Sequence, residues 1–254
     1  MSQPVVQSLD VELAWGGKLP SNGDFLWSTP RSDLRVRLEE WLQVGMYQGR
    51  SLHGDAWNHC LDRGAVWNFL IPARYIVKGS IVVGCIAPSR DRVGRRYPLV
   101  AVYAFPEKVL MQATAVLLEL PLLMSQLGAQ MHAGLQRVWP RDAMDSAIRS
   151  VFSAWRSELS LETLRALQPG QASDILDVLG TGWAAEGGDS ELHTRPMSRS
   201  SSYPWPDVAS IVQRPDCPSL WWTNGAAGAP LKAFSYESGL DGPLMTWLFG
   251  RANG

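Results

Sequence analysis

The sequence predicts an α/β fold in which a mixed, largely antiparallel sheet carries helices on both faces, as a three-layer sandwich. Three observations lead to this prediction. Short β-branched runs follow one another between residues 66 and 105, with connections too brief for parallel crossovers. Helical periodicity then begins near residue 109, and strand-like runs return after residue 206. Because both ends of the chain supply strands, we expect one sheet between two helical layers.

Four runs of apolar, mainly β-branched or aromatic residues in the first part of the chain predict strands: 11–15, 66–71, 80–87 and 100–105. A helix over 33–49 is predicted because Leu34, Leu38 and Trp41 recur at nearly 3.6-residue spacing. A shorter helix is predicted over 54–62. The close spacing of the strands along the chain favours antiparallel neighbours.

Helices dominate the next part of the chain. The predicted helices after residue 106 are 109–118, 121–137, 142–155, a short one from 160, 173–179 and, near the end, 242–249. Pro121 predicts either the start of a new helix or a kink in one long helix. Three later runs predict strands: 207–213, 219–223 and 231–236. Residues 180–206 lack periodicity and are rich in Gly, Ser, Arg and Pro, which predicts a mobile surface loop.

The composition excludes some classes of function. The chain of 254 residues has 46% hydrophobic and 19% charged residues, with a formal net charge of −1. A nearly neutral chain has no overall field that would draw it to nucleic acid or to an anionic membrane. We therefore expect no nucleic-acid partner, and any basic site must be local.

The cysteines and histidines predict neither a metal site nor a cofactor. Cys60, Cys85 and Cys217 are widely spaced, and the four histidines are scattered along the chain. The sequence contains no Cys-x-x-Cys pair and no Cys/His cluster, which favours reduced thiols in the cytosol. The sequence therefore predicts no bound metal and no cofactor.

The chain has no evident signal for export or for membrane insertion. Residues 1–10 are polar and lack the basic-then-apolar pattern of a signal peptide. The most apolar segment, 109–127, is interrupted by Gln112, Glu119 and Pro121, which favours core helix over a membrane span. We expect a cytoplasmic protein.

The segment 88–99, between two predicted strands, concentrates charge. It carries Arg90, Asp91, Arg92, Arg95 and Arg96. Guanidinium groups this close repel one another unless an anion is near, and Asp91 supplies only one negative charge. Gly94 suits a turn that needs positive φ. Two interpretations stay open: a solvated turn with one internal Asp–Arg bridge, or an exposed fork for a carboxylate, a phosphate or an acidic partner.

A second polar loop, 16–25, has similar chemistry. If both loops lie at the same edge of the sheet, their polar side chains form one patch, consisting of Lys18, Ser21, Asp24, Ser89, Asp91, Arg92 and Arg95. Four aromatic residues would surround it: Trp15, Phe25, Trp27 and Tyr97. Aromatic anchors beside arginines are typical of a protein–protein hot spot.

Known catalytic patterns do not match these loops. The run 16–18, Gly-Gly-Lys, is no phosphate loop, because Leu19 stands where a Ser or Thr is needed and the earlier Gly is missing. Ser21 and Ser89 lie outside any Gly-x-Ser-x-Gly elbow. We therefore expect a protein that is not an enzyme.

Both loops nevertheless carry motifs that resemble the type VI secretion accessory family called TagF, or ImpM. The first family motif, Gly-Lys-(Leu/Met)-Pro-Ser-His-Gly-Asp-Phe, is matched at 17–25, except that Asn22 replaces the histidine. The second, Pro-Ser-x-Asp-x-(Val/Gly)-Gly-Arg-x-(Tyr/Phe)-Pro-Leu, is matched at 88–99. The Ser-Leu-Trp-Trp-Thr run at 219–223 is similar as well.

The resemblance covers about residues 11–250 and implies a single TagF-like α/β domain over 1–254. It implies a cytoplasmic protein without catalysis that represses type VI secretion after translation. The implied partner is the forkhead-associated scaffold protein of that system. The sequence does not indicate an oligomeric state.

Two further interpretations of the patch stay open. In one, a small-ligand site or a hydrolase site for phosphate or nucleotide compounds uses Lys18, Asp24, Asp91, Arg92 and Arg95. In the other, Asp91 and Arg95 only bridge the loops and hold the sheet edge. The second interpretation is compatible with a regulatory binding surface.

Overall fold

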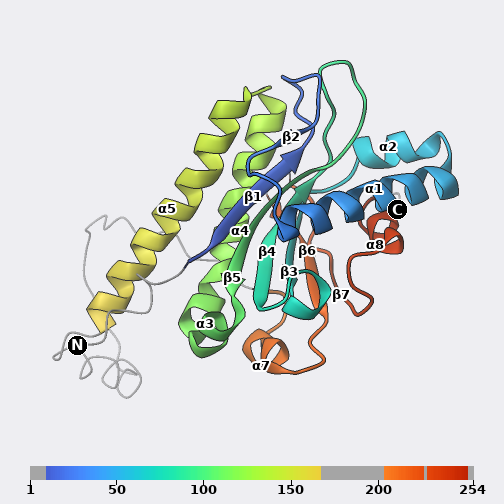
Figure 1. Ribbon diagram of the computed structural model, residues 1–254. Helices are drawn as coiled ribbons and strands as arrows, with labels where there is room; N and C mark the ends of the chain where they lie inside the picture. Colours follow the sequence, from blue (N-terminus) through green and yellow to red (C-terminus); the bar gives the residue numbers. More distant parts are fainter. Residues whose placement is uncertain (1–9, 167–202, 226–227, 251–254) are drawn as a thin grey trace, which may run out of the picture.

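A seven-stranded sheet forms the middle layer of the protein (Figure 1). The structure is a computed structural model that describes residues 10–166, 203–225 and 228–250. The strands are β1 (Glu12–Gly17), β2 (Leu26–Trp27), β3 (Trp67–Ile71), β4 (Ser80–Ala87), β5 (Leu99–Pro106), β6 (Ser219–Thr223) and β7 (Ala233–Tyr236). Their order is β2-β1-β5-β4-β3-β6-β7, and each pair of neighbours is antiparallel. Both ends of the chain supply strands, but on opposite sides of the central β5-β4-β3 unit.

Helices cover both faces of the sheet, as predicted (Figure 1). One layer consists of α1 (Asp33–His53), α2 (Ala56–Asp62) and α8 (Gly242–Phe249). The other consists of α3 (Glu107–Gln112), α4 (Thr114–Gln136), α5 (Arg141–Ala166) and α7 (Val208–Gln213). A short 3₁₀ turn, Ala73–Tyr75, connects β3 to β4. The α/β class with helices on both faces is confirmed.

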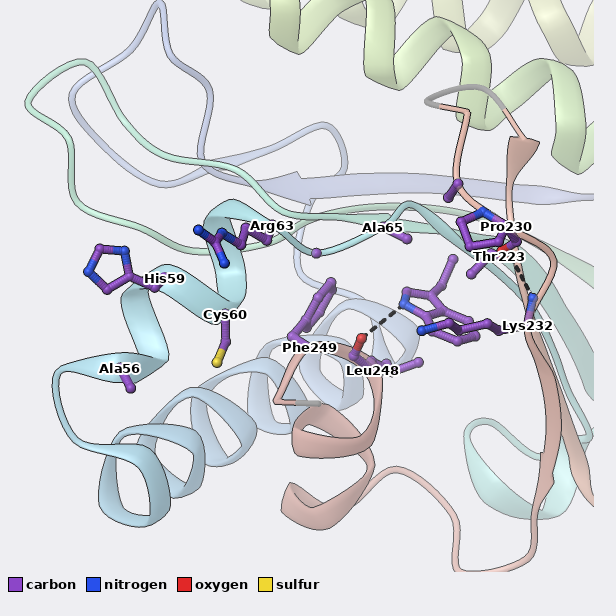
Figure 2. Close-up of a pocket in the computed structure, with 13 residues that line it drawn as sticks. Ala56, His59, Cys60, Arg63, Ala65, Thr223, Pro230, Lys232, Leu248 and Phe249 are labelled. Atoms are coloured by element: carbon purple, nitrogen blue, oxygen red, sulfur yellow. Dashed lines mark hydrogen bonds between the residues drawn. The ribbon is translucent and has the colours of Figure 1, made fainter. Parts of the chain in front are cut away.

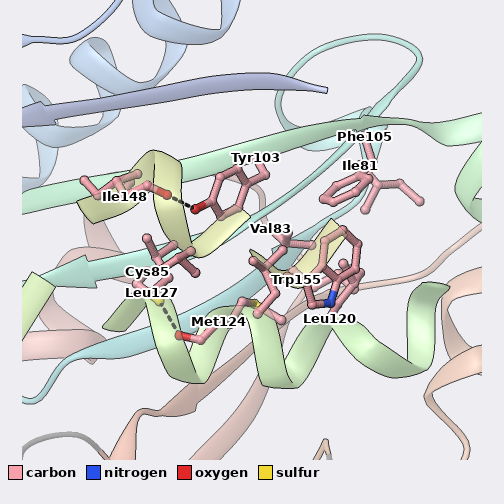
Figure 3. Packing of buried hydrophobic residues seen from close by; sticks show 14 of the residues in the cluster. Ile81, Val83, Cys85, Tyr103, Phe105, Leu120, Met124, Leu127, Ile148 and Trp155 are labelled. Atoms are coloured by element: carbon pink, nitrogen blue, oxygen red, sulfur yellow. Dashed lines mark hydrogen bonds between the residues drawn. The ribbon is translucent and has the colours of Figure 1, made fainter. Parts of the chain in front are cut away.

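The central strands are buried on both sides, which explains their continuous apolar sequence. In β5, Val100 and Val102 pack toward the α1 layer, whereas Ala101, Tyr103 and Phe105 pack toward α4 and α5. This division follows the two-residue period of a strand. Figure 3 shows Tyr103 and Phe105 of β5 packed among residues of β4, α4 and α5.

The prediction of a strand at 207–213 is wrong, because this segment forms helix α7. Val208 and Val212 are buried, and the partly buried Ile211 packs against the same core. These positions follow the i, i+3, i+4 spacing of a helix face. The β-branched composition of the segment outweighed that spacing in the prediction.

Other helix boundaries also differ from the predictions. Helix α1 continues to His53, four residues beyond the predicted end. Helix α5 runs without a break from Arg141 to Ala166 and therefore includes the short helix predicted from residue 160. The predicted helix 173–179 and most of the predicted loop 180–206 lie outside the described residues. No helix in the described ranges has both the length and the hydropathy to cross a bilayer.

Pro121 lies inside one continuous helix, and the helical region breaks earlier, at Ala113 between α3 and α4. A proline has no N–H to donate to the carbonyl four residues before it, here that of Leu117. The Tyr203 hydroxyl donates to this carbonyl at 3.0 Å instead. A distant side chain thus supplies the hydrogen bond that the proline removes from α4.

We expect Tyr203→Phe to lower the free energy of unfolding by about 1–3 kcal/mol, because it leaves the buried Leu117 carbonyl without this donor. Tyr103→Phe is a matched control. The Tyr103 hydroxyl also donates to a helix carbonyl, that of Ile148, at 2.9 Å. Residue 152 is Phe, so the helix keeps its own N–H donor for that carbonyl, and we expect a smaller loss of about 0.5–1 kcal/mol. Urea unfolding of both variants measures the difference, and equal losses would contradict this role for Tyr203.

Candidate functional site

The two polar loops lie side by side at one edge of the sheet (Figure 1). The first follows β1 and spans residues 18–25, and the second connects β4 to β5 over residues 88–98. The Arg92 amide donates to the Asn22 carbonyl at 2.9 Å. The Ser89 hydroxyl donates to the Lys18 carbonyl at 2.6 Å. The two loops are therefore neighbours, as a single patch requires.

A buried ion pair joins the loops from inside. Lys18 Nζ lies 2.9 Å from Asp91 Oδ2, and the two side chains are only 7% and 0% exposed. Arg95 Nε donates to the same oxygen at 2.7 Å. The backbone amides of Val93 and Arg95 donate to Asp91 Oδ1 at 3.1 and 2.8 Å. The Asp91 carboxylate therefore has cationic or amide donors on both of its oxygens.

These donors decide the charge of Asp91. Burial by itself raises the pKa of a carboxyl group, but the hydrogen bonds from Lys18 and Arg95 outweigh it and hold the pKa of Asp91 well below its usual range. Asp91 is thus an anion enclosed by its partners. Lys18 and Asp91 are thus buried and support the shape of the two loops from inside.

Two glycines permit this geometry. Gly94 has a φ of +87°, and its amide donates to the Asp91 carbonyl, so the predicted positive-φ turn is present. Gly17 has a φ of +127°, and a Cβ atom on it would overlap the carbonyl oxygen of Pro98. The chain segments at Gly17 and Pro98 lie so close together that no side chain fits at Gly17.

The outward face of the loops carries exposed apolar and charged side chains. We call it the loop surface, and it consists of the exposed residues Asp24, Phe25, Arg92, Val93 and Arg95 and the partly buried Tyr97. Phe25 is 56% exposed, and its ring packs edge-on against Tyr97 with the centroids 4.7 Å apart. The Lys18 ammonium lies over the Phe25 ring, 4.8 Å from its centroid. The buried ion pair and the exposed aromatic residue are therefore in direct contact.

The charges of the arginine-rich loop are only partly neutralised. Asp91 pairs with Arg95, and Asp62 on α2 accepts two hydrogen bonds from Arg96, at 2.8 and 2.7 Å. Arg90 and Arg92 take part in none of the ion pairs between described residues. The loop therefore contains the predicted Asp–Arg bridge and still presents positive charge.

The two predicted serines hold the loops in place. Ser21 donates its hydroxyl to the Trp139 carbonyl in the α4–α5 turn at 2.7 Å, and Ser89 donates to Lys18 as described above. Both hydroxyls are thus directed at main-chain carbonyls. Within the described ranges, no group of three metal-ligating side chains occurs.

Not all of the aromatic residues that were expected to surround the patch do so. Trp15 is fully buried and donates its indole N–H to Asp145 on α5 at 2.8 Å, so it does not surround the patch. The first strand directs this side chain into the core. Trp27 lies at the groove described next, with the Arg35 guanidinium 5.4 Å from its ring.

A polar groove of about 460 Å³ adjoins the loop surface. It is lined by Phe25, Leu26, Trp27, Arg35, Glu39, Gln43, Tyr97 and Arg141. Arg35 and Glu39 form an ion pair on α1 at 2.9 Å, and Arg141 begins α5. Sequence reasoning missed the residues from α1 and α5. The i, i+4 spacing of Arg35 and Glu39 predicts an ion pair on one helix, but it does not indicate which loop that pair faces.

Comparison with known proteins places these loops in a family. The TagF N-terminal domain, type VI secretion system-associated, matches residues 14–151, more than half of the 254-residue chain and both loops. No curated protein matches the chain. Among solved structures, the chain is similar to the crystal structure of PA0076 from Pseudomonas aeruginosa PAO1. The identity is 21%, each chain is covered to 96%, and the TM-score is 0.49.

Proposed function

The chain belongs to the TagF N-terminal domain family of type VI secretion-associated proteins, and from this premise we propose that it is a non-enzymatic cytoplasmic regulator. It represses type VI secretion after translation by binding the forkhead-associated scaffold protein of that system. The loop surface is the contact region. Phe25 and Tyr97 are its apolar anchors, and Arg92 is its principal charge.

The pre-organised shape of the loop surface supports this proposal most directly. The buried Lys18–Asp91 pair and the hydrogen bonds between the loops fix the backbone beneath Phe25 and Arg92. A partner that binds such a surface orders few additional residues, which lowers the entropic cost of association. An exposed aromatic residue beside an arginine is also the composition found at interface hot spots.

The side chains that could serve a hydrolase as nucleophile or base are occupied by other contacts or protonated, which favours binding over catalysis. Ser21 and Ser89 donate to main-chain carbonyls, and no histidine accepts a proton from either hydroxyl among the described hydrogen bonds. Burial raises the pKa of the Cys217 thiol to about 11, so this thiol is protonated at neutral pH. Lys18 and Asp91 satisfy each other. The arrangement favours a contact surface over a nucleophile with its base.

We expect Arg92→Glu to weaken binding of the forkhead-associated partner by about ten-fold or more, because it places like charge against an acidic contact. Arg92 is exposed and makes no ion pair with another described residue. The Tm of the Arg92→Glu variant should therefore stay within about 2 °C of the wild type. The measurement is calorimetry with the purified partner, together with a thermal melt of each variant. Arg95 is unsuitable for this test because it also donates to Asp91 and to the Gly23 carbonyl.

Lys108→Glu is the matched control. It makes the same change of charge at an exposed residue of α3, beyond the opposite end of β5. Equal loss of affinity in both variants would show an effect of net charge and would contradict a contact at the loop surface. A thermal shift of the wild type by inorganic phosphate or a nucleotide, lost in Arg92→Glu, would favour the small-ligand alternative instead.

A further inference from the structure

A second cavity lies away from the loop surface, between α2, the end of α8 and the segment that precedes β7 (Figure 2). Its volume is about 220 Å³. We call it the α2–α8 cavity. Its lining residues are Ala56, His59, Cys60, Arg63, Gly64, Ala65, Trp67, Thr223, Ala229, Pro230, Lys232, Leu248 and Phe249.

Small residues leave this space open. Ala56, Gly64, Ala65 and Ala229 line the cavity with little or no side chain. A Cβ atom on Gly64 would come within 2.6 Å of the Phe249 ring, so the wall is closely packed behind the opening. The cavity is therefore bounded by a well-packed part of the fold.

The polar atoms of the inner wall already have partners. The Trp67 indole N–H donates to the Leu248 carbonyl at 3.0 Å. The Thr223 hydroxyl donates to the Pro230 carbonyl at 2.8 Å. A ligand that relies on hydrogen bonds from this wall, such as a sugar, would find these donors occupied. The wall instead suits an apolar body that packs against Trp67 and Phe249, whose side chains are nearly buried.

The charge of the lining is positive. Arg63 and Lys232 are the charged residues of the lining, and none of its lining residues is Asp or Glu. Figure 2 shows His59 and Arg63 on α2 at one side and Lys232 at the other, with Leu248 and Phe249 between them. An anionic group attached to an apolar body would meet the Arg63 guanidinium at the α2 side of the opening.

We propose that the α2–α8 cavity binds a small, flat aromatic carboxylate. The ring packs against Trp67 and Phe249, and the carboxylate faces Arg63. The volume suits a ligand of this size, because a cavity of about 150 Å³ accommodates benzene and a somewhat larger one accommodates a bicyclic ring. This site is separate from the loop surface, and the inference does not rest on the proposed function.

The test uses 2-naphthoate as the probe, with 2-naphthalenemethanol and 2-naphthylmethylamine as neutral and cationic controls of the same ring. Titration calorimetry of the full chain at neutral pH should show the carboxylate binding about ten-fold more tightly than the alcohol, and the amine more weakly still. Equal affinity for all three compounds, or no binding of the carboxylate, would overturn the proposal.

Two variants locate the binding. Arg63→Glu, at an exposed position, should remove the preference for the carboxylate, whereas Lys108→Glu should leave it unchanged. Ala56→Trp, at the exposed start of α2, should block the opening and abolish binding of the ring itself. Unaltered binding in both Arg63→Glu and Ala56→Trp would place the probe elsewhere and contradict the proposal. Arg92→Glu should bind 2-naphthoate like the wild type, so this inference and the proposed function fail independently.

Discussion

Gly17→Ala is expected to destabilise the protein by about 3 kcal/mol or more and to separate the two loops. At a φ of +127° an alanine is strained, and its Cβ would overlap the Pro98 carbonyl oxygen of the neighbouring chain segment. That oxygen belongs to the backbone and cannot rotate away as a side chain does. The strand end must therefore move, and the Ser89–Lys18 hydrogen bond between the loops should be lost with it.

Urea unfolding and partner binding, measured on the same preparation, test this expectation. Gly94→Ala is the matched control, because Gly94 also has positive φ, +87°, but a Cβ atom there would have nothing within 4 Å. Its cost should be only that of the backbone conformation, about 1–2 kcal/mol. Similar losses in the two variants would mean that the close approach at Gly17 contributes nothing, contrary to this expectation.

Asp91→Asn is expected to lower the Tm by on the order of 10 °C, because it removes the charge that compensates the buried Lys18 ammonium. Asparagine retains the shape of the side chain, but both carboxylate oxygens of Asp91 accept hydrogen bonds, so the change removes the charge and one of the two acceptors. Adding Lys18→Met should restore part of the lost stability, since no unpaired charge then remains inside.

Asp62→Asn is the control for Asp91→Asn. It breaks the pair between Asp62 and Arg96, whose side chains are 40% and 30% exposed. Exposed pairs contribute about 0–1 kcal/mol, so the Tm should change by only a few degrees. Equal shifts for the two asparagine variants would show that the Lys18–Asp91 pair does not hold the loops together.

The same pair predicts how stability depends on pH. The pKa of Asp91 is lower in the folded state than its ordinary value of about 3.9 in an unfolded chain. Its contribution to stability is therefore fully present above about pH 4 and is lost as the pH falls toward the folded pKa. The Tm of the wild type should fall more steeply below pH 4 than that of Asp91→Asn, and parallel curves would contradict the ionic role.

Local patterns predicted most of the central fold. The strands β3, β4, β5 and β6 appear in the sequence as runs of β-branched and aromatic residues, because both of their faces are buried and almost every position must be apolar. The segment 207–213 was mispredicted because a short apolar run fits either period. Its helical state follows from packing against the core that α4 helps to form.

The candidate site, too, could be predicted from the sequence only in part. Both loops and their motif residues were identified from residue type and order alone. Whether each residue faces a partner or the interior was not, because a charged side chain is typically exposed unless a specific partner lies near it in space. Lys18 and Asp91 are 73 residues apart and become partners only after β1 pairs with β5.

The sequence by itself determined the fold class, the two loops and, through their motifs, the family. Only the tertiary structure decided that Lys18 and Asp91 are buried supports, that Trp15 is a core residue, and that Phe25 and Arg92 remain at the surface. The physical reason is that backbone propensity and periodicity are local, whereas burial and ion pairing depend on chain segments that meet only in the folded protein.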